Sequence, residues 1–179
     1  MKKIVIVALL WASNMAMAQE KMICKSGVIT FEASVPAFEE VKATNTSVTV
    51  VLNPKTGEIA SLALMKGFRF KIALMEEHFN ENYIESDRYP KAVFKGKIEN
   101  FDPNSLTTTP KDFVINGKLD LHGKWVVIKT VAKMSQTASG IILVSNFVVN
   151  ASDFNISIPS IVKNKVSNKI NIQLQAVLK

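Results

Sequence analysis

Alternation of apolar and polar residues runs through most of this chain and limits it to an all-β fold. In residues 91–98, apolar or small side chains occupy every second position, and lysines occupy most of the positions between them. The same period recurs in residues 113–122 and 170–178. A period of two predicts strands with one buried and one solvated face. Strands of that kind belong to antiparallel sheets.

Turn residues divide the alternating segments into eight expected strands. Proline, glycine or small polar residues interrupt the pattern at residues 53–57, 122–124 and 137–140, as in hairpin loops. The expected strands cover residues 22–34, 45–52, 58–65, 91–101, 112–122, 125–136, 140–150 and 169–178. Eight antiparallel strands in this order predict an up-and-down barrel or a sandwich, and barrel closure would remove exposed sheet edges.

Residues 72–83 depart from the alternation and predict one short helix inserted into the all-β domain. Met75, Phe79 and Tyr83 recur at intervals of four, which fits the helical period. Pro90 then ends regular structure before the next expected strand.

The N-terminus has the layout of a secretory signal peptide. Two lysines precede an apolar run at residues 4–11, which is too short to span a bilayer as a stable helix. Ala-Met-Ala at residues 16–18 supplies a cleavage site. We expect residues 1–18 to be removed and residues 19–179 to form one domain, periplasmic or secreted. A retained N-terminal anchor is the alternative.

Charge and cysteine content narrow the classes of function. The formal net charge is +7, and its scattered lysines are consistent with transient contact at a membrane surface or with simple solvation. The lysines do not cluster with aromatic residues as in a nucleic-acid interface, so no nucleic-acid partner is expected. Cys24 is the only cysteine and cannot form an internal disulfide. We interpret it as a small buried hydrophobic residue.

Patterns typical of catalysis, metals and cofactors are missing from the sequence. It contains no G-x-S-x-G, H-E-x-x-H or C-x-x-C spacing and no glycine-rich phosphate loop. Glu76, Glu77 and His78 are adjacent, but neighbouring helix residues point in different directions and would not converge on one ion. We therefore predict no metal, no cofactor and no enzymatic activity. A lipid-modifying enzyme with His78 in its site is kept as an alternative.

The richest group of aromatic and basic residues lies within residues 66–94. One interpretation is a helix that closes a barrel end with ordinary core aromatics. The other is a ligand entrance, where aromatic rings hold a hydrocarbon chain and basic groups contact an anionic head group. The residues alone leave both open.

Residues 68–98 (FRFKIALMEEHFNENYIESDRYPKAVFKGKI) resemble the signature region of the YceI-like family. The family pattern joins L-M-x-x-H-F-N-E-x-Y to E-S-x-x-Y-P-x-A-x-F-x-G, and every named position is met. Residues 117–123 resemble the family's G-x-L-x-x-H-G hairpin, and residues 153–159 resemble its D-[FY]-x-I-x-I-P segment. Together these pieces span nearly all of the expected mature chain.

The resemblance implies a lipocalin-like, eight-stranded antiparallel β-barrel, usually exported, whose characterised relatives bind a polyisoprenoid or another amphiphilic chain. It favours the ligand-entrance interpretation. We expect an exported binding protein that holds a polyisoprenoid or similar lipid for transport, storage or scavenging. A structural or interaction module with a side-chain-filled barrel is the alternative. The expected ligand-binding residues are Phe68, Phe70, Leu74, Met75, His78, Phe79, Tyr83, Phe94 and Leu119.

Overall fold

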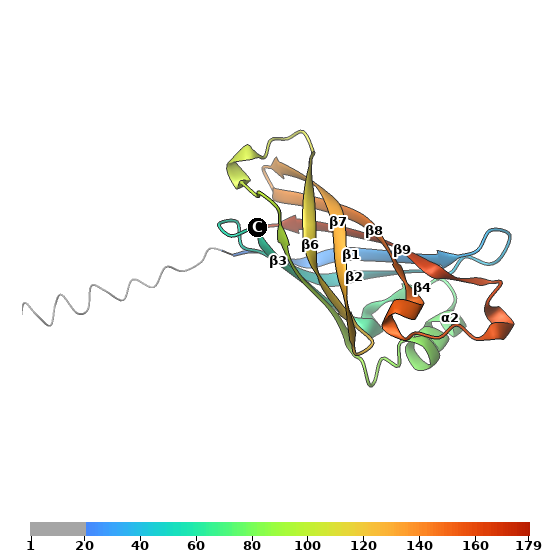
Figure 1. Cartoon of the computed structure of the whole chain (residues 1–179). Helices are drawn as coiled ribbons and strands as arrows, with labels where there is room; N and C mark the ends of the chain where they lie inside the picture. Colours follow the sequence, from blue (N-terminus) through green and yellow to red (C-terminus); the bar gives the residue numbers. More distant parts are fainter. Residues whose placement is uncertain (1–20) are drawn as a thin grey trace, which may run out of the picture.

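Eight strands, each hydrogen-bonded to its neighbours, close into a β-barrel (Figure 1). The structure is a computed structural model that describes residues 21–179, so the expected signal peptide lies outside the described residues. The barrel strands are β1 (Met22–Ser34), β2 (Lys42–Leu52), β3 (Glu58–Leu64), β5 (Lys91–Ile98), β6 (Lys111–Leu121), β7 (Lys124–Thr137), β8 (Gly140–Asn150) and β9 (Val166–Leu178). Antiparallel pairing of β1 with both β2 and β9 closes the ring, which confirms the predicted fold class.

The observed strands differ from the predicted ones mainly at their ends. β2 begins at Lys42 rather than residue 45, because the buried polar Asn45 masks the alternation while the ladder with β1 continues past it. β5 ends at Ile98 rather than residue 101, since Asn100 adopts a φ of 48° and turns the chain. β9 begins at Val166, three residues before the predicted start, where it pairs with the end of β1.

Inward side chains fill one end of the barrel. This filled end lies where β2 turns into β3 and where β9 finishes, and several of its side chains are fully buried: Leu52, Ile98, Met134, Ile141 and Leu178. Cys24 is buried there too, in keeping with its interpretation as a small hydrophobic residue. The Ile23 N–H donates to the Lys179 carbonyl at 2.7 Å, so the last residue of the chain is tied to β1.

The connection between β3 and β5 lies at the opposite end of the barrel (Figure 1). It contains the 3₁₀ turn η1 (Met65–Gly67), the two-residue strand β4 (Arg69–Phe70), the helix α2 (Ala73–His78) and the π-helical turn η2 (Phe79–Tyr83). The helix predicted over residues 72–83 therefore begins one residue later and widens after His78, where the Ile84 N–H reaches back to the Phe79 carbonyl. Within residues 21–179, no helix is both long and apolar enough to cross a membrane.

Three more 3₁₀ turns lie in the other long connections. The turn η3 (Pro103–Ser105) joins β5 to β6, while η4 (Ala151–Phe154) and η5 (Ser160–Val162) lie between β8 and β9. The ladder between β7 and β8 reaches only the Val131–Asn146 pair, and η4 packs against β7, β8 and β9 beyond that point. A turn therefore covers the barrel wall where its two strands separate.

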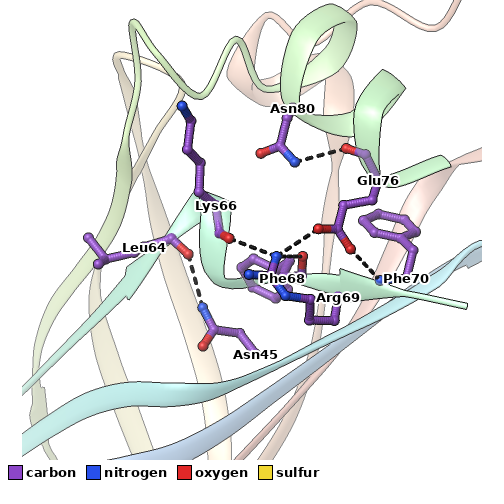
Figure 2. Close-up of polar contacts among 8 residues, drawn as sticks. All are labelled: Asn45, Leu64, Lys66, Phe68, Arg69, Phe70, Glu76 and Asn80. Atoms are coloured by element: carbon purple, nitrogen blue, oxygen red, sulfur yellow. Dashed lines mark hydrogen bonds and ion pairs between the residues drawn. The ribbon is translucent and has the colours of Figure 1, made fainter. Parts of the chain in front are cut away.

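Asn45 fastens the start of the β3–β5 connection to β2 (Figure 2). Its side chain is buried, its Nδ2 donates to the Leu64 carbonyl at 2.9 Å, and its Oδ1 accepts from the Ser47 N–H at 2.9 Å. A Cβ at Gly67 would lie 2.6 Å from Asn45 Nδ2, so η1 can pack this closely only because residue 67 has no side chain.

We expect Asn45→Ala to lower the free energy of unfolding by about 1–3 kcal/mol, because it leaves a buried carbonyl and a backbone N–H without their partner. Urea denaturation followed by circular dichroism measures the change. Asn171→Ala, at an exposed position on β9, is the matched control and should stay within about 0.5 kcal/mol of the wild type. Equal stability of the two variants would contradict the role given to Asn45.

Candidate functional site

A cavity of about 540 Å³ occupies the end of the barrel that the β3–β5 connection covers. Ligand pockets in proteins measure roughly 300–1,000 Å³, so this cavity has the size of a small-molecule site. A cavity of about 150 Å³ accommodates benzene, and on that scale about 540 Å³ holds roughly twenty carbon atoms. The barrel is therefore filled by side chains at one end and hollow at the other.

The alternating strands supply the cavity wall. Leu119 and Leu121 of β6 line it, as do Ile170, Ile172 and Leu174 of β9, while the residues between them are polar and lie on the outer face. These are the apolar positions that the period of two assigned to the buried face. The wall is largely apolar because most inward positions of each strand carry apolar side chains.

A few polar groups interrupt this apolar wall. Ser61, Thr130 and Ser145 line the cavity from three different strands. The hydroxyl oxygens of Thr130 and Ser145 lie 3.1 Å apart, and Ser145 also donates to a backbone carbonyl of β7. Glu39 and Lys165 place one negative and one positive side chain among the lining residues, on the β1–β2 and β8–β9 connections.

Four phenylalanine rings form one side of the cavity. Phe31 of β1 contacts Phe68, Phe70 and Phe79 of the β3–β5 connection, with ring centroids 5.3, 5.7 and 5.3 Å apart. Phe79 also lies 5.2 Å from Phe70 and 5.9 Å from Phe68. Aromatic pairs at these distances stabilise by about 0.5–1.5 kcal/mol beyond the burial of their area. The rings therefore join the connection to the barrel and face the cavity together.

Glu76 links α2 to β4 beneath the helix (Figure 2). Arg69 Nη1 donates to its Oε1 at 2.7 Å, and the Phe70 N–H donates to its Oε2 at 3.1 Å. Asn80 Nδ2 donates to the Glu76 carbonyl at 2.8 Å. One carboxylate thus holds Arg69 and Phe70 of β4 against the helix that follows them.

His122 joins three connections at the same end of the barrel. Its ring Nδ1 donates to the Phe154 carbonyl at 3.0 Å, and its Nε2 lies 3.2 Å from the carboxylate of Glu85. The Tyr89 ring packs 4.4 Å from the His122 ring, and a Cβ at Gly123 would come within 2.7 Å of Tyr89. Residues that carry the family resemblance are therefore in contact in the folded chain, and they hold these three connections together.

Two glycines on the inner face of the barrel make room for a side chain rather than for a ligand. Gly96 of β5 and Gly117 of β6 lie directly opposite each other in the ladder. A Cβ on either would come within 2.8 Å of the Phe94 ring, which therefore lies over both glycines. The pair thus allows Phe94 to lie flat against the wall while still lining the cavity.

Most residues expected from the sequence to bind ligand lie on this cavity. Eight of the nine are among its lining residues: Phe68, Phe70, Met75, His78, Phe79, Tyr83, Phe94 and Leu119. Leu74 is not, and 57% of its surface is exposed. Leu74 directly precedes Met75 on α2 and points about 100° away from it around the helix axis, which turns Leu74 toward solvent. Leu74 is therefore removed from the candidate site.

Other lining residues were missed because the sequence gives only the inward face of a strand. Phe31, Phe147 and Phe154 line the cavity, although no local feature separates them from core residues of the filled end. Phe154 lies in the segment that resembles the family's D-[FY]-x-I-x-I-P pattern, and this was the one available signal.

His78 lines the cavity from the end of α2 and is exposed. Among the residues that the structure describes, no carboxylate forms an ion pair with it and no hydrogen bond to its ring is found. An activated base requires such an orienting partner. The described chain likewise contains no group of His, Cys, Asp and Glu side chains that could hold a metal ion.

Comparisons with known proteins agree with this architecture. A model of the YceI-like domain family matches residues 23–178. None of the curated proteins matches the chain. A polyisoprenoid binding domain from Saccharophagus degradans, implicated in plant cell wall breakdown, is 15% identical with a TM-score of 0.73, over 89% of this chain and 97% of that one. BcnA from Burkholderia cenocepacia is 14% identical with a TM-score of 0.68, over 85% and 96%. The Campylobacter jejuni YceI protein is 18% identical with a TM-score of 0.61, over 81% and 89%.

We expect Glu76→Ala to loosen the β3–β5 connection without unfolding the barrel, because it removes the acceptor for Arg69 and for the Phe70 N–H. Amide hydrogen exchange in residues 69–83 should become several-fold faster, since a lost partner of this kind costs on the order of 1 kcal/mol. Glu77→Ala, at the neighbouring exposed carboxylate outside these contacts, is the control and should leave exchange unchanged. Identical exchange in both variants would show that Glu76 does not hold the segment.

Proposed function

Because this chain belongs to the family of YceI-like domains, we propose that it is an exported protein that binds an apolar-tailed amphiphile, a polyisoprenoid or similar lipid, inside its barrel. After removal of residues 1–18 it acts in the periplasm or outside the cell, where it transports, stores or scavenges that lipid. The observation that carries this proposal is the hollow, apolar end of the barrel, with its volume of about 540 Å³.

Burial of hydrocarbon supplies the free energy of binding. Each methylene-sized group moved from water into an apolar site contributes about 0.8 kcal/mol. Roughly twenty such groups contribute on the order of 15 kcal/mol, from which the lost freedom of the ligand and of the cavity side chains is subtracted. Micromolar affinity requires a net of about 8 kcal/mol, so a chain of this length reaches it without any strong polar contact when these costs stay below about 7 kcal/mol.

The polar residues at the hollow end of the barrel suit the head group of an amphiphile. Glu39 lies on the β1–β2 connection and Lys165 on the β8–β9 connection. His78 and Tyr83 line the cavity from the β3–β5 connection. A tail in the hollow end leaves the head group among these side chains and close to water. The description of the Saccharophagus degradans structure as a polyisoprenoid binding domain supports the same class of ligand.

The hollow interior also separates this proposal from a structural module with a side-chain-filled barrel. In such a module the inward residues of all strands would pack as they do near Leu52 and Met134. Instead, Phe94, Phe147 and Ile172 border open space. Natural cores contain few voids larger than a water molecule, so a void of about 540 Å³ needs an occupant or a function.

Filling the cavity should abolish lipid binding. Ser61 faces the cavity from β3, and Ser61→Phe places a ring in the space that the tail would occupy. We expect the wild type to carry lipid after purification, detected by native mass spectrometry and solvent extraction, and the variant to carry at least tenfold less. Ala60→Phe adds the same ring at the adjacent position, outside the cavity lining, and should load like the wild type.

Three results would count against the proposal. One is a wild type that carries no lipid and acquires none from a lipid mixture. Another is equal loading of Ser61→Phe and the wild type. The third is equal loss of loading in the two phenylalanine variants, which would mean that a change of the fold, rather than occupation of the cavity, removes the lipid.

A further inference from the structure

The outer face of β3, β5, β6 and β7 exposes large apolar side chains outside the cavity. Leu62 and Leu64 of β3 are 37% and 56% exposed, and Trp125 and Val127 of β7 are 59% and 64% exposed. Isolated exposed apolar residues are ordinary in soluble proteins, but contiguous ones mark surfaces that bind something. Whether these four are contiguous depends on the strand register.

The register brings them onto one surface. Leu62 lies opposite Val93, Val93 opposite Asp120, and Asp120 opposite Trp125, so one row crosses four neighbouring strands. The next row of the same face runs through Ala60, Lys95, Lys118 and Val127. We call this surface the docking face and define it by Leu62, Leu64, Val93, Lys95, Lys118, Trp125 and Val127.

The lysines of the docking face lack acidic partners. Lys95 and Lys118 lie directly opposite each other on β5 and β6, an arrangement that disfavours the sheet because like charges repel. Among the residues that the structure describes, neither forms an ion pair, and neither do the neighbouring Lys91, Lys97 and Lys129.

The remaining charges of this surface do not offset that excess. Asp120 lies in the first row of this face, Glu58 lies in the row beyond the second, and the Glu99 carboxylate contacts Asn116 of that same row. These three carboxylates are outnumbered by Lys91, Lys95, Lys97, Lys118 and Lys129. The Lys118 ammonium group lies 4.2 Å from the centre of the Trp125 ring and makes a cation–π contact with it. An anionic partner would relieve this repulsion.

We propose that the docking face binds the surface of an anionic lipid bilayer. Tryptophan prefers the boundary between head groups and acyl chains, and lysines beside it contact anionic head groups. Exposed apolar residues with lysines beside them combine burial of apolar surface with electrostatic attraction to anionic lipids. These are the two contributions that hold peripheral proteins on membranes. The inference rests on the proposed function, because a protein that loads a membrane lipid has to meet a bilayer.

The position of the docking face suits that task. Leu64 is followed by Met65, which lines the cavity, and Trp125 follows the turn that contains His122. The docking face therefore reaches the end of the barrel at which the cavity lies. A bilayer bound there lies next to the β3–β5 connection. A lipid tail that passes this connection has only a short distance to travel into the hollow end.

Vesicle co-sedimentation tests the docking face directly. We expect the purified protein to bind phosphatidylcholine vesicles that contain phosphatidylglycerol, with affinity that falls as salt rises. The double variant Lys95→Glu, Lys118→Glu should bind roughly twentyfold more weakly or worse, because each lysine near an anionic surface contributes about fivefold. Trp125→Ala should weaken binding to the same vesicles several-fold at high salt, where the apolar contribution remains.

A matched control separates this face from net charge. Lys25→Glu, Lys55→Glu changes the total charge by the same amount at exposed positions on β1 and on the β2–β3 turn, and should bind like the wild type. Equal weakening of both double variants would overturn the proposal, since total charge rather than this face would govern binding. Equal binding to vesicles with and without phosphatidylglycerol would overturn it too, because the lysines would then contribute nothing. Absence of binding to either kind of vesicle would also overturn it and point to an acidic protein partner.

Lipid loading distinguishes failure of this inference from failure of the proposed function. The docking-face lysines are not among the cavity-lining residues, so Lys95→Glu, Lys118→Glu should accept lipid delivered from detergent as the wild type does. A wild type that carries lipid but does not bind anionic vesicles contradicts only the role proposed for the docking face. A wild type that binds these vesicles yet never takes up lipid contradicts the proposed function alone.

Discussion

The closed ladder of backbone hydrogen bonds from β1 through β9 and back to β1 is the constraint on which the rest of this structure depends. Closure gives each strand one neighbour on either side along most of its length, so its alternating side chains can face only the shared interior or the outside. The inner residues must then either pack against one another or enclose a space. In this chain they do both, at opposite ends of the same barrel.

The hollow end persists because other segments hold its boundary in place. Asn45 fixes the start of the β3–β5 connection and Glu76 fixes the helix over β4. His122, in the β6–β7 turn, ties the β3–β5 connection to the β8–β9 connection. These hydrogen bonds are local and polar, whereas the cavity is apolar. Without them the aromatic rings of the connection could collapse into the space that they now border, since apolar surfaces gain free energy by contact with one another.

The inner and outer faces of the barrel are formed by alternate residues of the same strands, but one face is apolar and the other is basic. The inner face of β5 and β6 is apolar, and its Phe94 ring lies over two glycines and borders the cavity. The outer face of the same strands carries Lys95 opposite Lys118, without acidic partners among the described residues. We propose that the interior takes up a hydrocarbon tail and that the exterior contacts anionic head groups.

The sequence by itself determined the strands, their faces and the family, because a period of two is a local property of covalent geometry and the signature residues are contiguous. It also indicated most of the candidate site through the segment from Phe68 to Phe94. Only the tertiary structure decided which inward residues border empty space, why Leu74 does not, and how His122 reaches Phe154 across 32 positions of the chain. Those outcomes depend on strand register and barrel closure, which bring together residues that no local pattern relates.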